Sequence, residues 1–279
     1  MRDYTSFHIG GACKRMVWPK SEEELAKILS YCDENGLPLY LVGNGSNLLV
    51  ADEGIDGVVV QLGARFSGIR LEEGNLLVCE AGATLAKVCV FAREHSLTGL
   101  EFAYGIPGSV GGAAYMNAGA YGGEMKDVVA YCEHIAPDGT RGRLSGDELG
   151  FSYRHSAYCE NGFCVSRVAF RLQPGDPKKI AAAMEDYMTR RKTKQPLEFP
   201  SAGSTFKRPE GNYASALIDQ CGLKGVTCGG AQVSEKHAGF VINAGGATCA
   251  DVLNLMDRVR DEVEKQTGYR LEPEVKMIP

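Results

Sequence analysis

The motifs that mark several common enzyme classes are missing from this chain of 279 residues. It contains no G-x-x-x-x-G-K-[ST] phosphate loop, no H-E-x-x-H zinc motif and no G-x-S-x-G nucleophile turn. A G-x-G-x-x-G dinucleotide fingerprint between a strand and a helix is also absent. These absences argue against a P-loop NTPase and against a Rossmann fold, so any nucleotide cofactor must be held in another way.

Long apolar runs are missing too, and no basic run dominates the chain. No stretch is long enough to span a bilayer, and the N-terminal residues MRDYTSFHIGG contain no signal-peptide core. The net charge of -5 argues against general nucleic-acid binding. The ten cysteines form no C-x-x-C pair and read as small buried hydrophobes, while the five histidines are dispersed, so no metal site is expected. We predict a cytoplasmic monomer that binds neither membranes nor nucleic acids.

Alternating helix and strand signals occupy the first third of the chain. A capping box and an apolar stripe predict a helix over 21–36, and a second helix is predicted over 84–95. Apolar runs predict a short buried strand at 39–42 and further strands at 57–62 and 75–80. This alternation is typical of an α/β lobe.

A basic helix end marks the predicted domain boundary. Asp176 and Pro177 are typical of a helix start, and that helix ends in the basic stretch 190–194, where cations suit the helix C-terminus. We therefore predict one domain over 1–174, with lobes of about 1–53 and 54–174, and a smaller α+β domain over 175–279. The other predicted elements are strands at 128–135, 139–144, 164–172, 232–233, 240–243 and 271–278, and helices at 213–221 and 248–267.

The residues from Gly105 to Glu124 form the most unusual stretch of the sequence. Seven of these twenty residues are glycine, although glycine loses the most backbone freedom on folding. Bare backbone can approach a large ligand and present N–H groups to a phosphate. A flexible loop is the alternative, but residues such as Ile106 and Val110 do not suit a solvated linker.

A second glycine-bearing segment, Gly43 to Asn47, follows the predicted strand at 39–42. Alone it could be only a turn. Together the two segments offer backbone N–H groups, serine hydroxyls and asparagine amides, which are uncharged donors that suit a pyrophosphate. The predicted cofactor-binding residues are Gly43, Asn44, Gly45, Ser46, Asn47, Gly105, Ile106, Pro107, Gly108, Ser109, Gly111, Gly112, Asn117, Gly119 and Ala120.

Three polar residues near the predicted boundary and the C-terminus are candidates for chemistry, but each also has a structural interpretation. Arg154 follows an aromatic residue in the run FSYRHS and could be a partner in a surface salt bridge. Ser204 lies among small residues in SAGSTFK and could be a turn residue or a helix cap. Glu274 in the run EPE could be an exposed strand residue.

Taken together, these segments strongly resemble the UDP-N-acetylenolpyruvoylglucosamine reductases, flavoenzymes of bacterial cell-wall synthesis. The resemblance implies a two-lobed FAD-binding domain of the vanillyl-alcohol-oxidase type, followed by a smaller α+β substrate-binding domain. The chain resembles the shorter class, because there is no room after FSYR for the insertion that closes over substrate in longer members. The matching segments, in family order, are TSFHIGG, GNGSNLL, the Gly105 to Glu124 run, FSYR, SAGSTFKRP, GGAQV with AGFVIN, and LEPEV.

The resemblance also implies a reaction and roles for single residues. FAD, bound non-covalently, and NADPH as co-substrate would reduce UDP-N-acetylglucosamine enolpyruvate to UDP-N-acetylmuramate. Arg154 matches the arginine that stabilises the developing enolate. Glu274 matches a glutamate in the same role, which requires the acid to be protonated or to share a proton. Ser204 matches the residue that delivers the proton to the second carbon, and as an unassisted hydroxyl it would need help from the basic carbanion or a relay.

Four further residues align with substrate-site positions of the family. They are Tyr153, Lys194, Lys207 and His237, although Lys207 and His237 are equally consistent with structural roles. A flavin oxidase of the same fold and a flavin-binding sensor are the alternative functions. The C-terminal motifs argue against the oxidase, and the joint presence of Arg154, Ser204 and Glu274 argues against the sensor.

Overall fold

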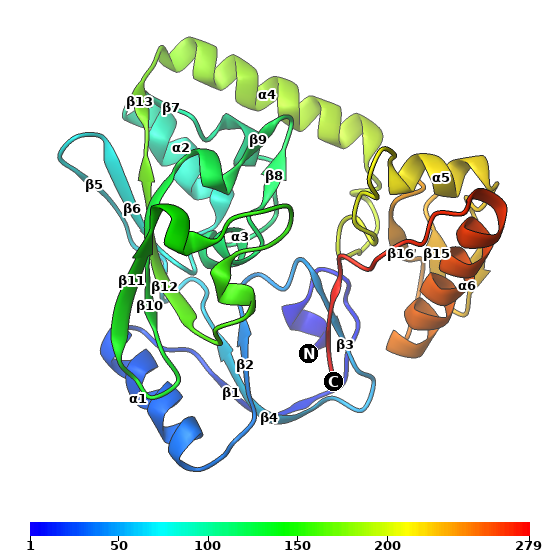
Figure 1. Ribbon diagram of the computed structural model, residues 1–279, viewed down its shortest axis with the longest axis horizontal. Helices are drawn as coiled ribbons and strands as arrows, with labels where there is room; N and C mark the ends of the chain where they lie inside the picture. Colours follow the sequence, from blue (N-terminus) through cyan, green and yellow to red (C-terminus); the bar gives the residue numbers. More distant parts are fainter. The chain divides into compact units, whose positions relative to one another are not determined.

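The computed structural model describes residues 1–279, which form two compact units built from interleaved segments (Figure 1). Unit 1 contains residues 1–14, 45–56 and 192–279, and unit 2 contains residues 15–44 and 57–191. The domains predicted over 1–174 and 175–279 are continuous ranges. They stay a prediction, because units of compact packing and ligand-binding domains need not share their limits.

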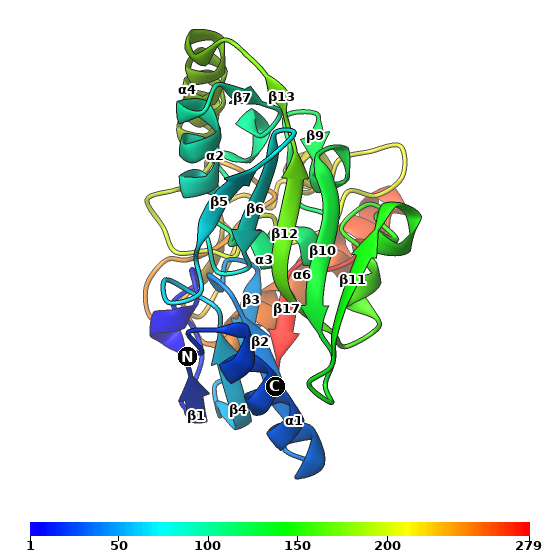
Figure 2. The ribbon, with the colours of Figure 1, turned by 90° about the vertical axis from the view of Figure 1, so that its left-hand side faces the viewer.

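A five-stranded antiparallel sheet is the framework of unit 2 (Figure 2). Hydrogen-bonded pairs such as Val168 with Cys79 join strands that are far apart in the sequence. The strands predicted near 75–80, 128–135, 139–144 and 164–172 are confirmed, and the edge strand β5 is an addition. In spatial order the strands are β11 (Arg141–Ser145), β10 (Val129–Ile135), β12 (Cys164–Arg171), β6 (Leu76–Glu80) and β5 (Ile69–Glu72).

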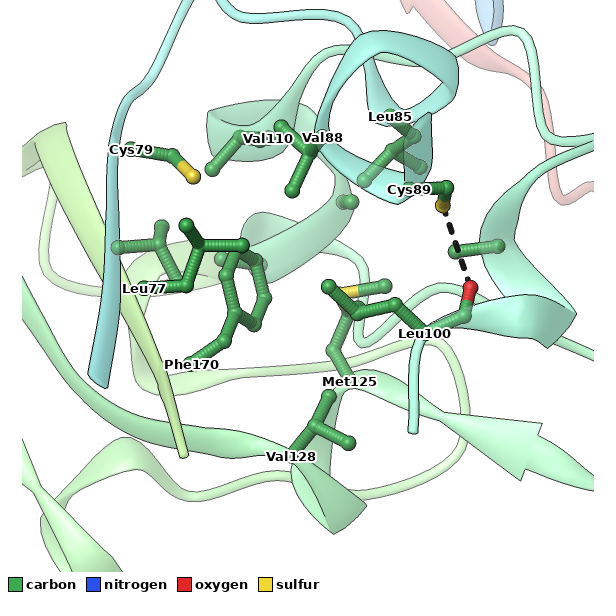
Figure 3. Packing of buried hydrophobic residues seen from close by; sticks show 14 of the residues in the cluster. Leu77, Cys79, Leu85, Val88, Cys89, Leu100, Val110, Met125, Val128 and Phe170 are labelled. Carbon is green, nitrogen blue, oxygen red and sulfur yellow. Dashed lines mark hydrogen bonds between the residues drawn. The ribbon is translucent and has the colours of Figure 1, made fainter. Parts of the chain in front are cut away.

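The main core of unit 2 lies where helix α2 (Leu85–Glu94) and helix α3 (Val110–Tyr115) pack near strands β6 and β12 (Figure 3). Leu77 and Phe170 from the sheet and Val88 from α2 are fully buried there. The thiol of Cys89 donates a hydrogen bond to the carbonyl of Leu100 at 3.2 Å. Burial raises the pKa of the Cys79 thiol to about 12, so this cysteine behaves as the small hydrophobe that the sequence predicts.

Helix α1 (Glu22–Glu34) covers a second, smaller cluster of unit 2. The side chain of Ser21 caps its N-terminus, accepting a hydrogen bond from the Glu24 backbone, as the capping box predicts. Strand β2 (Leu39–Val42) pairs in parallel with β4 (Ile55–Gln61), and β1 (Cys13–Val17) lies on the other side of β4. The prediction that 39–42 is a buried strand is wrong in one respect: only Val42 is buried, because β2 is an edge strand.

A network of two carboxylates and two arginines ties α1 to the five-stranded sheet. Arg167 contacts Glu22 at 3.0 Å and Glu133 at 3.1 Å, and Arg143 contacts the other oxygen of Glu133 at 2.7 Å. Burial disfavours the charged form of Glu133, but the hydrogen bonds from Arg143 and Arg167 outweigh it and lower the pKa of Glu133. The network therefore favours the folded state while Glu133 is ionised.

Replacing Glu133 with glutamine should lower the free energy of unfolding at pH 7 by about 1–3 kcal/mol, because two arginines lose a charged acceptor. The lowered folded-state pKa means that ionised Glu133 stabilises the fold above the unfolded pKa of about 4.3. That contribution is lost as the pH falls through the folded-state pKa. Urea unfolding should therefore show that the difference in the free energy of unfolding between wild type and variant becomes smaller on acidification.

Asp56→Asn is the matched control for this experiment, because the Lys14–Asp56 pair has side chains 62% and 81% exposed. It should change the free energy of unfolding by less than about 1 kcal/mol. If Glu133→Gln lowered the free energy of unfolding by the same amount at acidic pH as at pH 7, the ionised form of Glu133 would not be what stabilises the fold.

Unit 1 is organised around helix α6 (Cys249–Thr267) and helix α5 (Ala214–Gln220). A capping box of Thr248 and Asp251 starts α6, and Gly268 ends it in the left-handed conformation at φ 76°. Asp52 adds a second cap, because its carboxylate accepts hydrogen bonds from the backbone of Cys249 and Ala250 at 2.8 and 3.1 Å. The strands of unit 1 are β3 (Leu48–Val50), β14 (Thr227–Cys228), β15 (Ala231–Val233), β16 (Val241–Asn243) and β17 (Lys276–Ile278).

Several short segments differ from the predicted elements. Strands β1 and β3 and helix α3 were not expected, and the strand predicted over 271–278 is regular only in β17. No helix combines the length and the apolar character that crossing a membrane requires. The remaining elements are α4 (Pro177–Lys194), β7 (Leu97–Thr98), β8 (Gly119–Ala120), β9 (Gly123–Glu124), β13 (Gln173–Pro174) and five short 3₁₀ helices at Arg2–Tyr4, Glu101–Ala103, Met125–Asp127, Gly146–Leu149 and Ala157–Cys159.

Candidate active site

The glycine-rich run has a defined structure in place of a flexible loop. Ser109 caps α3 and accepts a hydrogen bond from the backbone of Gly112 at 3.4 Å. The backbone N–H groups of Val110 and Gly111 donate to the carbonyls of Ala83 and Ala81, both at 2.8 Å. A Cβ atom at Gly111 would lie 2.7 Å from the side chain of Ala81, so glycine permits this close packing. The run is therefore docked on the residues that follow strand β6.

The structure brings the start of the other glycine segment against this run. A Cβ atom at Gly43 would collide with the hydroxyl of Ser109, and the amide of Asn44 donates to the carbonyl of Pro107 at 3.2 Å. Both segments belong to unit 2 at this point. Glycine backbone from two distant parts of the sequence is thus adjacent, as a pyrophosphate site formed by both segments requires. Direct binding of a cofactor by these residues stays a prediction.

The end of the first segment, from Gly45 to Asn47, belongs to unit 1. Gly45 has φ 61°, and a Cβ atom there would collide with the carbonyl of Tyr4, so the position requires glycine. The carbonyl of Gly45 accepts a hydrogen bond from the backbone of Ser6 at 3.1 Å. The side-chain amide of Asn47 donates to the carbonyl of Glu274 at 3.0 Å. The motif is thereby fixed to the N-terminal and C-terminal segments of the chain.

Asn117 is fully buried, and its side chain is used within the protein. Its amide donates to the carboxylate of Glu124 at 2.7 Å and to the carbonyl of Ser152 at 2.9 Å, while its oxygen accepts from the backbone of Lys126 at 2.9 Å. These bonds join the glycine-rich run to the segment that carries Arg154. Asn117 thus orients a predicted catalytic segment, whatever its backbone contributes to cofactor binding.

Arg154 lies in a tight turn beside the hairpin of strands β8 and β9. Ser152 and His155 form an isolated antiparallel bridge around it, and its own backbone has φ 56°. Its guanidinium lies 5.1 Å from the ring centre of Tyr153 and contacts the carbonyl of Gly119 at 3.5 Å. The half-buried side chain is therefore held close to the predicted cofactor residues Gly119 and Ala120.

The other two predicted catalytic residues lie on neighbouring backbone segments of unit 1. The N–H of Glu274 donates to the carbonyl of Thr205 at 2.8 Å, and Phe206 forms an antiparallel bridge with Pro273. Ser204 directly precedes Thr205 and is exposed, whereas Glu274 is half-buried. The backbone segments that carry Ser204 and Glu274, from opposite ends of the C-terminal region, are thus adjacent.

The predicted substrate residues of unit 1 differ in their surroundings. Lys194 ends α4 and is exposed, while Lys207 forms an ion pair with Glu272 at 3.3 Å. The Nδ1 atom of His237 accepts a hydrogen bond from the backbone of Gly239 at 3.2 Å. Burial lowers the pKa of His237, and the charge of Lys224 adds to this effect, so the imidazole is neutral at pH 7. The turn contact supports a structural role and leaves the substrate role a prediction.

The sequence did not single out an aromatic and basic group next to the glycine-rich run. Tyr121 and Tyr187 stack with ring centres 4.6 Å apart and ring planes 2° from parallel. A Cβ atom at Gly105 would lie 3.1 Å from the side chain of Arg191, whose pKa is lowered by burial. Within the basic end of α4, the sequence analysis gave only Lys194 a functional role. Helical spacing from Tyr187 to Arg191 was the signal that could have found this group.

Two family models match successive parts of the chain. Residues 13–145 match the FAD binding domain, and residues 195–278 match the UDP-N-acetylenolpyruvoylglucosamine reductase C-terminal domain. The expected order, an FAD-binding domain followed by the family's own C-terminal domain, is thereby confirmed.

Full-length relatives agree with both matches. UDP-N-acetylenolpyruvoylglucosamine reductase of Caldanaerobacter subterraneus subsp. tengcongensis is 48% identical over 100% of this chain and 91% of its own length. The reductase of Clostridium novyi is 47% identical over 100% of this chain and 90% of its own. The crystal structure of MurB, the same reductase, from Thermus caldophilus superposes with a TM-score of 0.86 at 36% identity, covering 100% of this chain and 97% of that one. On these grounds the chain belongs to the UDP-N-acetylenolpyruvoylglucosamine reductase family of flavoprotein oxidoreductases.

Proposed function

We propose that this protein reduces UDP-N-acetylglucosamine enolpyruvate to UDP-N-acetylmuramate with NADPH as the hydride source, in the synthesis of peptidoglycan precursors. The observation that carries the proposal is the backbone bond from Glu274 to Thr205, because it holds the backbone of Glu274 beside the Ser204 segment. These are the two residues to which the family resemblance gives proton and enolate chemistry. The protein would act in the cytoplasm as a monomer. Its activity would serve cell-wall biogenesis, cell shape and cell division.

The residues of the two glycine segments fit non-covalent FAD. The half-buried Gly43 lies against the hydroxyl of Ser109, so that glycine backbone and a hydroxyl group, both uncharged partners for a pyrophosphate, are adjacent. Asn44 and Ser109 lie beside it as uncharged polar groups. Bound FAD would supply hydride transfer to the substrate. The chain itself would hold the pyrophosphate, present Arg154 near Gly119 and exclude water.

The proposed roles of the catalytic residues follow from their chemistry. Hydride addition to the methylene carbon of the enolpyruvyl group leaves negative charge on the adjacent carbon and its carboxylate. The planar guanidinium of Arg154 matches that carboxylate, and a protonated Glu274 would donate a hydrogen bond to the enolate. Ser204 would then deliver a proton to the carbanion. Tyr153, Lys194, Lys207 and His237 would contact the substrate or the NADPH phosphates.

The visible spectrum of the purified protein tests this proposal. We expect a yellow protein whose flavin absorbance is bleached by NADPH and restored by the enolpyruvyl sugar nucleotide, so that steady NADPH oxidation requires that substrate. Oxygen consumption with a reduced alcohol or sugar and without NADPH would indicate the oxidase. Stable FAD binding without turnover would indicate the sensor. A colourless protein that cannot be reconstituted with FAD would refute the proposal.

A further inference from the structure

The peptide groups on both sides of Glu274 are held by different parts of the chain. On one side, the N–H of Glu274 donates to Thr205, next to Ser204. On the other side, the carbonyl of Glu274 accepts the side-chain amide of Asn47 at 3.0 Å. Glu274 is therefore the link between the Ser204 segment and the end of the GNGSN motif, and all of these residues belong to unit 1.

Asn47 also binds the segment that follows Glu274, through its own backbone. Its carbonyl accepts a hydrogen bond from the N–H of Lys276 at 2.9 Å, directly before the parallel pairing of β3 with β17. The side-chain amide extends this ladder to Glu274, at a point where regular strand pairing has ended. The bonds to Glu274 and Lys276 flank Val275 and restrict rotation of the peptide that carries the Glu274 side chain.

We infer that Asn47 is a positioning residue for the carboxyl group of Glu274, acting in the step that reduces the enolpyruvyl substrate. This inference rests on the proposed function and deepens it. It differs from the direct contact to FAD that the sequence predicts for Asn47, because a contact to FAD would affect both half-reactions. Loss of the amide bond would let the Glu274 peptide turn, and a displacement of about 1 Å at a catalytic group can cost about 10²-fold in rate.

The test separates the two half-reactions in a stopped-flow spectrometer, with Asn47→Ala and the near-isosteric Asn47→Asp saturated with FAD. We expect reoxidation of the reduced flavin by the enolpyruvyl sugar nucleotide to slow by about 10–100-fold in both variants. Reduction of the flavin by NADPH should stay near the wild-type rate. Asn47→Asp keeps the side-chain shape and removes the N–H donor, so it serves if the alanine variant folds poorly.

A double-mutant cycle with Glu274→Gln shows whether Asn47 acts through Glu274. In the Glu274→Gln background, Asn47→Ala should cost little further in reoxidation, because coupled residues are not additive. The matched control is Asn35→Ala, which removes an asparagine amide bond to the carbonyl of Tyr31 at the exposed end of α1. It should leave both half-reactions unchanged.

Hydrogen exchange of the Glu274 amide provides a readout that does not depend on activity. Asn47→Ala should speed exchange at Glu274 while leaving the amides of α6 unchanged. Additive losses in the cycle, equal slowing of both half-reactions, or unchanged exchange at Glu274 would each overturn the inference. A wild-type protein whose reduced flavin is not reoxidised by the enolpyruvyl substrate would instead overturn the proposed function, and the exchange measurement would still decide the role of Asn47.

Discussion

Replacement of Ser204 with alanine is expected to lower turnover by about 10²–10⁴-fold, the usual contribution of a positioned proton donor. Reduction of the flavin by NADPH should remain near the wild-type rate, because Ser204 acts only after hydride has reached the substrate. Its location favours this role, since the exposed side chain directly precedes Thr205, which is bonded to Glu274. Steady-state NADPH oxidation and the two half-reactions measured by flavin absorbance give the comparison.

Ser201→Ala is the matched control in the same segment. Ser201 is half-buried, and its hydroxyl accepts a hydrogen bond from the backbone of Gly203 at 3.4 Å. Loss of this hydroxyl should change local packing while the proposed proton donor, Ser204, stays in place. Turnover of the Ser204→Ala variant within a few-fold of wild type would show that the proton comes from another group.

Local signals in the sequence predicted the long elements well. Helices α1, α2 and α6 are capped at their N-termini by Ser21, Thr84 and Thr248, and each of these side chains accepts a hydrogen bond from the backbone three residues later. Such caps act within one turn of helix and are therefore readable from the sequence alone. Helix α3 was missed for the opposite reason. Its sequence VGGAAY contains two glycines, which disfavour a helix, and its stability comes from docking on Ala81 and Ala83.

Tertiary pairing explains what was missed in the C-terminal strand and in the site. The strand predicted over 271–278 is regular only where β3 supplies a partner, and before it Pro273 makes one isolated bridge with Phe206. Motif resemblance indicated Ser204, Glu274 and Asn47 separately. No periodicity or spacing could show that the peptide of Glu274 is bonded to Thr205 on one side and to Asn47 on the other. That arrangement depends on segments that only the folded chain brings together.

Arg154 should be the second large contributor to catalysis. Its guanidinium can match the two oxygens of the substrate carboxylate as negative charge develops, which Met cannot do and Lys can do only as a point charge. Arg154→Met is therefore expected to lower kcat/KM for the enolpyruvyl substrate by about 10²–10³-fold, the cost of removing one preorganised donor for developing charge. Arg154→Lys should recover part of this loss.

The backbone at Arg154 makes the comparison between these two variants informative. Its φ of 56° is unfavourable for any side chain with a Cβ atom, so Met and Lys meet the same backbone demand and differ mainly in charge. Arg141→Met is the control for loss of an arginine, since Arg141 forms an exposed ion pair with Glu23 at 2.9 Å. If Arg154→Met and Arg154→Lys lost activity equally, the planar guanidinium with its contacts to Tyr153 and Gly119, which neither variant keeps, would explain the loss better than charge. If neither lost activity, the enolate would have to be stabilised without Arg154, and the assignment carried by the FSYR motif would be wrong.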